Sequence, residues 1–214
     1  MSEAAAPDNS AAPPDPEDQA RANLYGLVSR LFYAPADPNL LAEISRAAPQ
    51  TQDDDAPGPL RDAWQALQEV CRSAFPALVR QEFEGLFVGV GKAEVTPYLS
   101  AYAQPSSPER YLVSLRDQLA VWALTRREGI FEMEDHVSGV SDVMRWLVEN
   151  ERPLADQRGF FETYVYPGAA PFCFAVQNAA SAAFYKAVAA FALAFFDVEK
   201  AAFEMTDTTE PSSR

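Results

Sequence analysis

Apolar residues recur at three- and four-residue spacing along most of the chain, a pattern typical of amphipathic α-helices. Seven of the eight helices that the pattern predicts begin at a proline, and the first of those prolines follows Asp15, an arrangement favoured at helix starts. The longest wholly apolar run, 187–196, falls in the last stripe, so we expect that helix to be buried in the middle of a bundle. The pattern predicts helices at 16–33, 38–47, 59–71, 76–87, 108–128, 137–147, 153–164 and 171–202.

Several expected helix ends rest on single residues. Ser106 and Glu109 have capping-box spacing, and Gly129 is a natural stop for the same helix. Tyr166-Pro167-Gly168 is expected to break the pattern before the last helix. Asp135 precedes an apolar stripe, where its carboxylate would accept hydrogen bonds from the first turn as an N-cap, a role compatible with a functional one.

No segment alternates with the period of a strand, and no repeat of fixed length appears. The sequence therefore predicts an all-α fold, a single helical bundle of about eight helices. The expected domain is 15–203, with a disordered N-terminal tail at 1–14 and a frayed C-terminal tail at 204–214. The helical period also disappears in a loop at 88–105, where we expect at least one aromatic residue to pin the loop to the core.

The chain of 214 residues has a formal net charge of −14, which argues against nucleic acid or an anionic membrane surface as partner and favours a cationic one. Cys71 and Cys173 lack CxxC partners and lie in apolar surroundings, so we expect both to be reduced core residues. The N-terminal stretch lacks the pattern of a secretory signal. The longest apolar run is well short of the roughly 20 residues that span a bilayer. We expect a cytoplasmic protein without membrane insertion.

Potential chemistry is concentrated in the stretch 131–136, which holds the single histidine of the chain and three carboxylates. We expect these carboxylates to lie at a helix N-terminus, where the dipole favours negative charge. The loop before it contributes two tyrosines, Tyr98 and Tyr102.

Five stretches follow one another in chain order over roughly residues 20–197: Tyr25 with Leu31-Phe32 and Pro35, Glu82-Phe83 with Leu86-Phe87-Val88-Gly89, Pro97-Tyr98-Leu99-Ser100-Ala101-Tyr102, Glu132-Met133-Glu134-Asp135-His136, and Phe184-Tyr185. Together they resemble the TorD/DmsD/NarJ family of chaperones for molybdenum-containing redox enzymes, and the fourth is similar to that family's E-x-x-D-H signature. Phe83 and Met133 stand where the family usually has tyrosine and proline, and Tyr166-Pro167-Gly168 stands near a common Pro-Trp.

The resemblance implies a TorD-like fold and a chaperone without enzymatic activity or a cofactor of its own. Its partners would be the twin-arginine signal peptide and the apo form of a molybdenum-containing oxidoreductase, whose maturation and cofactor insertion it assists before export. Carboxylates can form charge-assisted hydrogen bonds with the arginines, while aromatic residues and methionine can contact the apolar part of the peptide. The expected peptide-binding residues are Pro97, Tyr98, Ser100, Tyr102, Glu132, Met133, Glu134, Asp135 and His136.

Two other classes of function stay open. One is an enzyme, either a metal-dependent hydrolase using Glu132, Asp135 and His136 or a nucleophile enzyme using Cys173 with His136. A catalytic zinc normally takes three protein ligands and often several histidines, whereas this chain has one histidine. Cys173 lies between two phenylalanines, a context that favours an inert thiol. The other is a helical scaffold that works as a dimer, in which the apolar last helix would supply the interface. The chain is therefore expected to be a monomer or a homodimer.

Overall fold

The computed structural model describes residues 15–47, 58–89, 93–125 and 132–207. Within these residues, the regular secondary structure is entirely helical. The predicted all-α fold is confirmed. The predicted tail at 1–14 lies outside the described residues. The elements are α1 (Pro16–Tyr33), α2 (Pro38–Arg46), α3 (Pro59–Ser73), α4 (Pro76–Phe83), the π-helical turn η1 (Glu84–Val88), α5 (Ser100–Ala103), α6 (Pro108–Val121), α7 (Val137–Glu149), α8 (Leu154–Phe160), the π-helical turn η2 (Phe161–Val165), α9 (Tyr166–Asn178) and α10 (Phe184–Asp207).

The first four helices begin at the prolines that predicted them. Asp15 accepts a hydrogen bond from the Glu17 amide at 3.0 Å, and Asp37 accepts one from the Asn39 amide at 2.8 Å. Proline fits the first helical turn because the amide it lacks would have no partner there, and the aspartate satisfies an amide that follows. Helix starts in this part of the chain are therefore set by local sequence.

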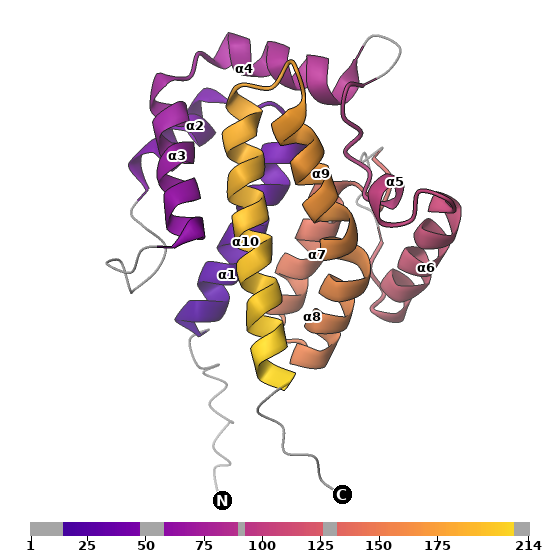
Figure 1. Cartoon of the computed structure of the whole chain (residues 1–214). Helices are drawn as coiled ribbons and strands as arrows, with labels where there is room; N and C mark the ends of the chain where they lie inside the picture. Colours follow the sequence, from indigo (N-terminus) through magenta and orange to yellow (C-terminus); the bar gives the residue numbers. More distant parts are fainter. Residues whose placement is uncertain (1–14, 48–57, 90–92, 126–131, 208–214) are drawn as a thin grey trace, which may run out of the picture.

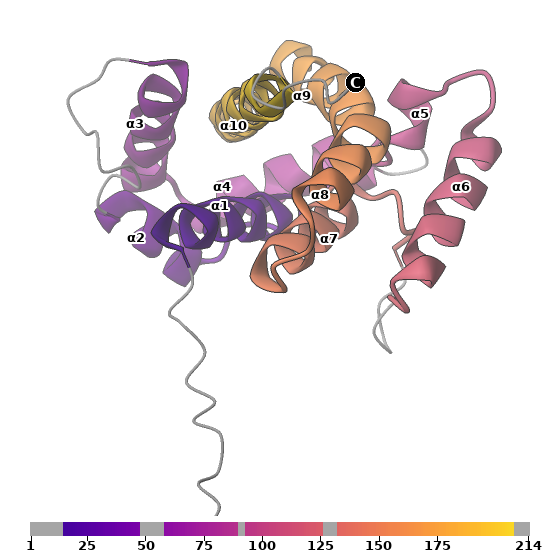
Figure 2. The ribbon, with the colours of Figure 1, turned by 90° about the horizontal axis from the view of Figure 1, so that it is seen from below.

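Helices α1, α7, α9 and α10 form the body of the bundle, and α4 with η1 lies across one end of it (Figure 1). α1 packs mainly against α7, while α10 packs mainly against α9 and α3. Viewed along the bundle, α6 lies at the edge of the molecule beyond α5 (Figure 2). Buried apolar side chains from Leu24 to Phe203 form one contiguous cluster. Among the described helices, none combines the length and apolar character that crossing a membrane requires.

Two boundaries predicted for the C-terminal half are wrong. Tyr166-Pro167-Gly168 does not break a helix, because α8, η2 and α9 follow one another without interruption. Pro167 is the second residue after the π-helical turn, where regular α-helical hydrogen bonding is already interrupted. The helix predicted at 171–202 is instead divided between α9 and α10. α10 extends through residues 204–207 of the predicted tail, and residues 208–214 lie outside the described residues.

Two carboxylates from distant parts of the chain hold the turn between α9 and α10. Glu82 accepts hydrogen bonds from the first amides of α10, including those of Phe184 and Tyr185 at 3.0 and 2.8 Å. Glu94 accepts one from the Ala180 amide at 2.6 Å. A new helix leaves its first amides without partners, and its dipole favours an anion at that end. The division was missed because these capping groups are not local in sequence.

Both ends of α6 also differ from the prediction. Its N-cap is Ser107 rather than Ser106, and the cap side chain makes no hydrogen bond to the first turn. The helix ends at Val121, before the predicted stop at Gly129. The backbone then closes a Schellman motif in which Ala123 adopts a left-handed φ of 53°. Glycine usually fills this position, so an alanine there gave no stop signal.

A buried carboxylate connects the first and last helices. Glu199 of α10 is 2% exposed and accepts hydrogen bonds from Arg21 of α1 at 2.9 and 3.0 Å and from the Tyr25 hydroxyl at 2.8 Å. Arg21 also donates to Gln157 of α8 at 3.1 Å. Burial and the neighbouring Glu199 raise the pKa of Tyr25 well above its ordinary value, so its hydroxyl remains a donor. A carboxylate this deep is tolerated because it is fully paired.

Replacing Glu199 by glutamine should lower the free energy of unfolding by about 3 kcal/mol, because it removes one partner of a buried ion pair. Urea denaturation measures this change. Glu162→Gln is the matched control, since Glu162 pairs with Arg158 at the surface and its loss should cost less than about 1 kcal/mol. Equal losses in the two variants would contradict a special role for Glu199.

Candidate functional site

The two segments that the sequence singled out are brought together by backbone hydrogen bonds. The Leu99 amide donates to the Asp135 carbonyl at 2.9 Å, and the Val137 amide donates to the Pro97 carbonyl at 2.9 Å. Tyr98 and His136 form an isolated antiparallel bridge. The tyrosine loop and the acidic turn are thus one structural unit. Phe131, at the start of the acidic stretch, lies outside the described residues.

Tyr98 connects the two segments through its side chain as well. Its hydroxyl donates to Glu132 Oε2 at 2.5 Å, and its ring meets the His136 ring edge to face with centroids 5.5 Å apart. Burial, followed by the contact with Glu132, raises the pKa of Tyr98 to about 12. The hydroxyl therefore keeps its proton and holds the half-buried Glu132 carboxylate in place.

Asp135 is completely buried. Its Oδ2 accepts a hydrogen bond from the Ser100 amide at 3.3 Å, which fixes the start of α5. Its Oδ1 has no hydrogen-bond partner among the described residues. An unsatisfied buried oxygen typically costs about 1–3 kcal/mol, so the contacts that keep Asp135 in this position must outweigh that penalty.

His136, not Asp135, is the N-cap of α7, so the predicted capping role of Asp135 is wrong. The ring Nδ1 accepts from the Ser138 amide at 3.2 Å and lies 2.7 Å from the Ser138 hydroxyl. Because Nδ1 accepts a hydrogen bond from the backbone amide, the neutral ring must carry its own proton on Nε2. Burial lowers the pKa of His136 and favours this neutral form, against the opposing effect of nearby carboxylates.

The remaining residues of the acidic turn face outward to different degrees. Met133 is 41% exposed. Glu134 is paired with Arg116 of α6, which donates through Nη2 at 2.9 Å. No sequence pattern indicated Arg116, because its contact with the turn depends on how α6 packs.

Tyr102 pins the loop, as was expected of at least one aromatic residue. Its hydroxyl donates to the Thr96 carbonyl at 2.9 Å, and its ring packs edge to face on Phe172 of α9. Burial raises its pKa to about 12, so the hydroxyl remains a donor. The predicted loop at 88–105 also contains the single-turn helix α5, which periodicity did not reveal.

Gly168 of α9 lets the loop approach closely. A Cβ added at this glycine would lie 2.7 Å from both the Cβ and the carbonyl oxygen of Leu99. Any larger residue at this position must displace the segment that carries Tyr98. The glycine expected to break a helix instead permits contact between the helix and the loop.

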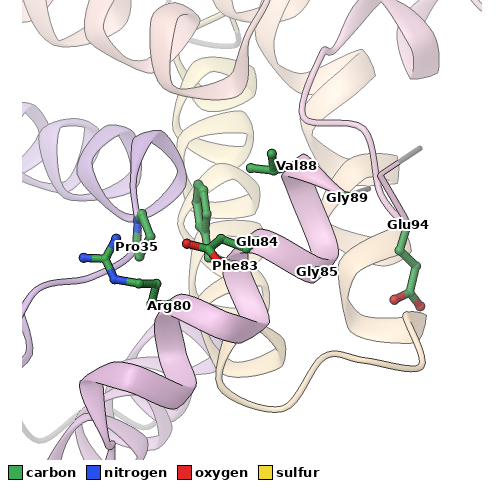
Figure 3. Close-up of a pocket in the computed structure, with 8 residues that line it drawn as sticks. All are labelled: Pro35, Arg80, Phe83, Glu84, Gly85, Val88, Gly89 and Glu94. Carbon is green, nitrogen blue, oxygen red and sulfur yellow. The ribbon is translucent and has the colours of Figure 1, made fainter. Parts of the chain in front are cut away.

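A separate groove of about 670 Å³ lies where η1 crosses the end of the bundle. Figure 3 shows Pro35 and Arg80 on one side of it and Glu94 on the other, with Gly85 and Val88 between them. A Cβ added at Gly85 would meet no atom within 4 Å. This surface was not predicted, because it depends on how α1 and η1 meet.

The residues invoked for an enzyme are arranged differently from what those mechanisms need. Cys71 and Cys173 are free and buried, as expected. Burial raises the pKa of Cys71 to about 12 and that of Cys173 well above the ordinary range, so neither supplies a thiolate near neutral pH. Within the described ranges, no three His, Cys, Asp or Glu side chains cluster in a way that could hold a metal ion.

Comparison with known proteins relates the chain to a family, to a curated relative and to a solved structure. The family model described as nitrate reductase delta subunit matches residues 53–173, which include both paired segments. An uncharacterized protein of Haemophilus influenzae is 31% identical over 112 residues, 52% of this chain and 54% of that protein, so the chain spans about half the length of the curated relative it matches. The crystal structure of a protein from Archaeoglobus fulgidus assigned to redox enzyme maturation matches 90% of this chain and 99% of its own, with a TM-score of 0.51 at 16% identity, a likeness of fold.

Gly168→Ala should lower the free energy of unfolding by about 2 kcal/mol, because the new methyl group overlaps the backbone of Leu99. Gly159→Ala in α8 is the matched control, since a Cβ there meets no atom within 4 Å and alanine should be neutral or stabilise the helix by up to about 1 kcal/mol. Chemical denaturation distinguishes the two. A Gly168→Ala protein as stable as the control would contradict the close contact.

The stability of the protein should fall as the pH drops through about 6.5. The folded pKa of His136 is lowered, so the unfolded chain binds more protons below the ordinary value near 6.5, and protonation favours unfolding. His136→Asn keeps a good N-cap and removes the only histidine, so it should flatten this dependence between pH 7 and 5.5. Denaturation at several pH values measures it. A free energy of unfolding that rises on acidification would contradict the lowered pKa of His136 in the folded protein.

Proposed function

Because the chain belongs to the TorD/DmsD/NarJ family, we propose that it is a maturation chaperone for a redox enzyme and not an enzyme itself. Its client in this proposal is the apo form of a molybdenum-containing oxidoreductase, and its ligand is the twin-arginine signal peptide of that client. The likeness of fold to a protein assigned to redox enzyme maturation supports the general role. The finer role is supported by the joined tyrosine loop and acidic turn.

The observation that carries the proposal is the position of Glu132. Its carboxylate is half-buried, is held by the Tyr98 hydroxyl, and lies where two segments of the family match meet. Guanidinium groups form strong charge-assisted hydrogen bonds with carboxylates, and partial burial strengthens them. The aromatic ring of Tyr98 can also contact a guanidinium through its face. A net charge of −14 would attract a cationic ligand from a distance.

Burial divides the predicted peptide-binding residues into two roles within this proposal. Glu132, Met133, Glu134 and Tyr98 contact the peptide. The others position them: Asp135 and His136 are 0% and 5% exposed, Asp135 holds the Ser100 amide, Pro97 pairs with the start of α7, and Tyr102 pins the loop.

The apolar part of the signal peptide needs a surface near the acidic turn. Met133 offers one beside Glu132. The groove bounded by Pro35 and Val88 offers another, and Glu94 at its edge lies four positions before Tyr98 along the chain (Figure 3). An extended peptide covers about 3.3 Å per residue, so a short stretch after the arginines can reach from one surface to the other.

In the cell, this binding would keep the client in the cytoplasm until its molybdenum cofactor is inserted. Covering a cationic and apolar signal delays export and also prevents its aggregation, since exposed apolar segments associate readily. The chaperone needs no cofactor for this role and can act as a monomer or a homodimer.

Glu132→Gln should weaken binding of a synthetic twin-arginine signal peptide more than tenfold, because a charge-assisted contact in a partly desolvated site is worth roughly 2–5 kcal/mol. The melting temperature of the variant should change little, because Glu132 is only half-buried and glutamine has nearly the same shape as glutamate. Isothermal titration calorimetry and thermal melts on one preparation measure both.

The matched control is Glu69→Gln, which makes the same change in net charge on α3, on the opposite side of the bundle from α6 (Figure 1). It should change affinity less than twofold. If wild-type protein fails to bind the peptide, or if both variants bind as the wild type does, the proposed role of Glu132 is wrong.

A further inference from the structure

Arg116 places a guanidinium group of the protein itself on the acidic turn. Its Nε and Nη2 donate to the same oxygen, Glu134 Oε2, at 3.1 and 2.9 Å. Arg116 belongs to α6, whereas Glu134 lies in the turn that leads into α7. The protein thus already presents, at one carboxylate of the proposed site, the chemical group that a twin-arginine ligand would bring.

The exposed fractions of the two side chains show which one can move. Glu134 is 15% exposed and Arg116 is 48% exposed, so the arginine is the partner with more contact with solvent. Ion pairs with an exposed partner are held weakly, and a long arginine side chain has many alternative rotamers in water. An arriving cation can therefore replace Arg116 without unfolding the turn.

α6 does not need to move for this exchange. The helix is attached to η2 by other contacts, in which the Tyr111 hydroxyl donates to the Tyr164 carbonyl and Ser114 pairs with the Tyr164 hydroxyl. Leu115, the neighbour of Arg116, is fully buried. The backbone of α6 stays anchored while the Arg116 side chain swings into solvent.

We propose that Arg116 is a specificity-determining residue that masks Glu134 until a second guanidinium group displaces it. This inference rests on the proposed function. The first arginine of the ligand binds Glu132 beside Tyr98, and the second replaces Arg116 on Glu134. A ligand with one cation forms an ion pair with one carboxylate, whereas a ligand with adjacent arginines forms ion pairs with both.

The displacement reduces the contribution of the second arginine, because each guanidinium gained at Glu134 is offset by one lost. Removing Arg116 should therefore strengthen binding of a paired-arginine peptide and leave a single-arginine peptide nearly unchanged. General attraction by the extra negative charge would act on both peptides and is screened by salt. The difference between the peptides isolates the local effect.

The test uses Arg116→Gln in the full chain and two synthetic signal peptides, one with the arginine pair and one in which the second arginine is glutamine. Calorimetry in about 0.15 M salt, where exposed charges more than about 8 Å apart are screened, should show three- to tenfold tighter binding of the paired peptide. The single-arginine peptide should change less than twofold. Arg116→Lys, which keeps the charge but lacks the planar fork, should give a smaller gain.

Arg110→Gln is the matched control, since Arg110 is an exposed arginine of the same helix and its loss changes the net charge equally. It should affect both peptides less than twofold. Equal gains for both peptides, equal gains in the control, or weaker binding by folded Arg116→Gln protein would each overturn the inference while leaving the proposed function intact. Failure of the folded wild type to bind the paired peptide would overturn both.

Discussion

The candidate site depends on two backbone hydrogen bonds, from Leu99 to Asp135 and from Val137 to Pro97, which join a loop to the start of a helix. The residues around these two hydrogen bonds hold this joint between the loop and the helix in place. Asp135 is buried beneath it, Tyr102 and Gly168 seat the loop on α9, and the His136 ring caps α7. Because the joint is formed by the backbone, it fixes the outward side chains next to it in a defined relation.

Five of the acidic residues differ in what they contact. Glu82, Glu94 and Glu199 contact other parts of the protein, where they satisfy backbone amides or an arginine. Glu132 and Glu134 lie in the outward turn, where Tyr98 and Arg116 contact them. In the proposed function, Glu132 and Glu134 are the carboxylates that act on the cationic part of the ligand. A count of charges in the sequence cannot separate them from the other three.

Local signals predicted the fold class, the first four helix starts and the two segments that meet at the site. They failed wherever the deciding contact was distant or unusual. The break before α10 depends on Glu82 and Glu94, the stop after α6 uses an alanine in place of glycine, and the cap of α7 is a histidine. The groove beside η1 and the contact of Arg116 with the turn arise only from packing. The predicted ligand contacts stay a prediction.

The most direct test of the account is hydrogen exchange of the full chain with and without a twin-arginine signal peptide. The account predicts that binding slows exchange at residues 96–102 and 132–138 together, because the two segments share backbone hydrogen bonds and form one surface. Slowed exchange confined to another part of the bundle, such as α3 or the C-terminal half of α10, with both segments unchanged, would contradict it.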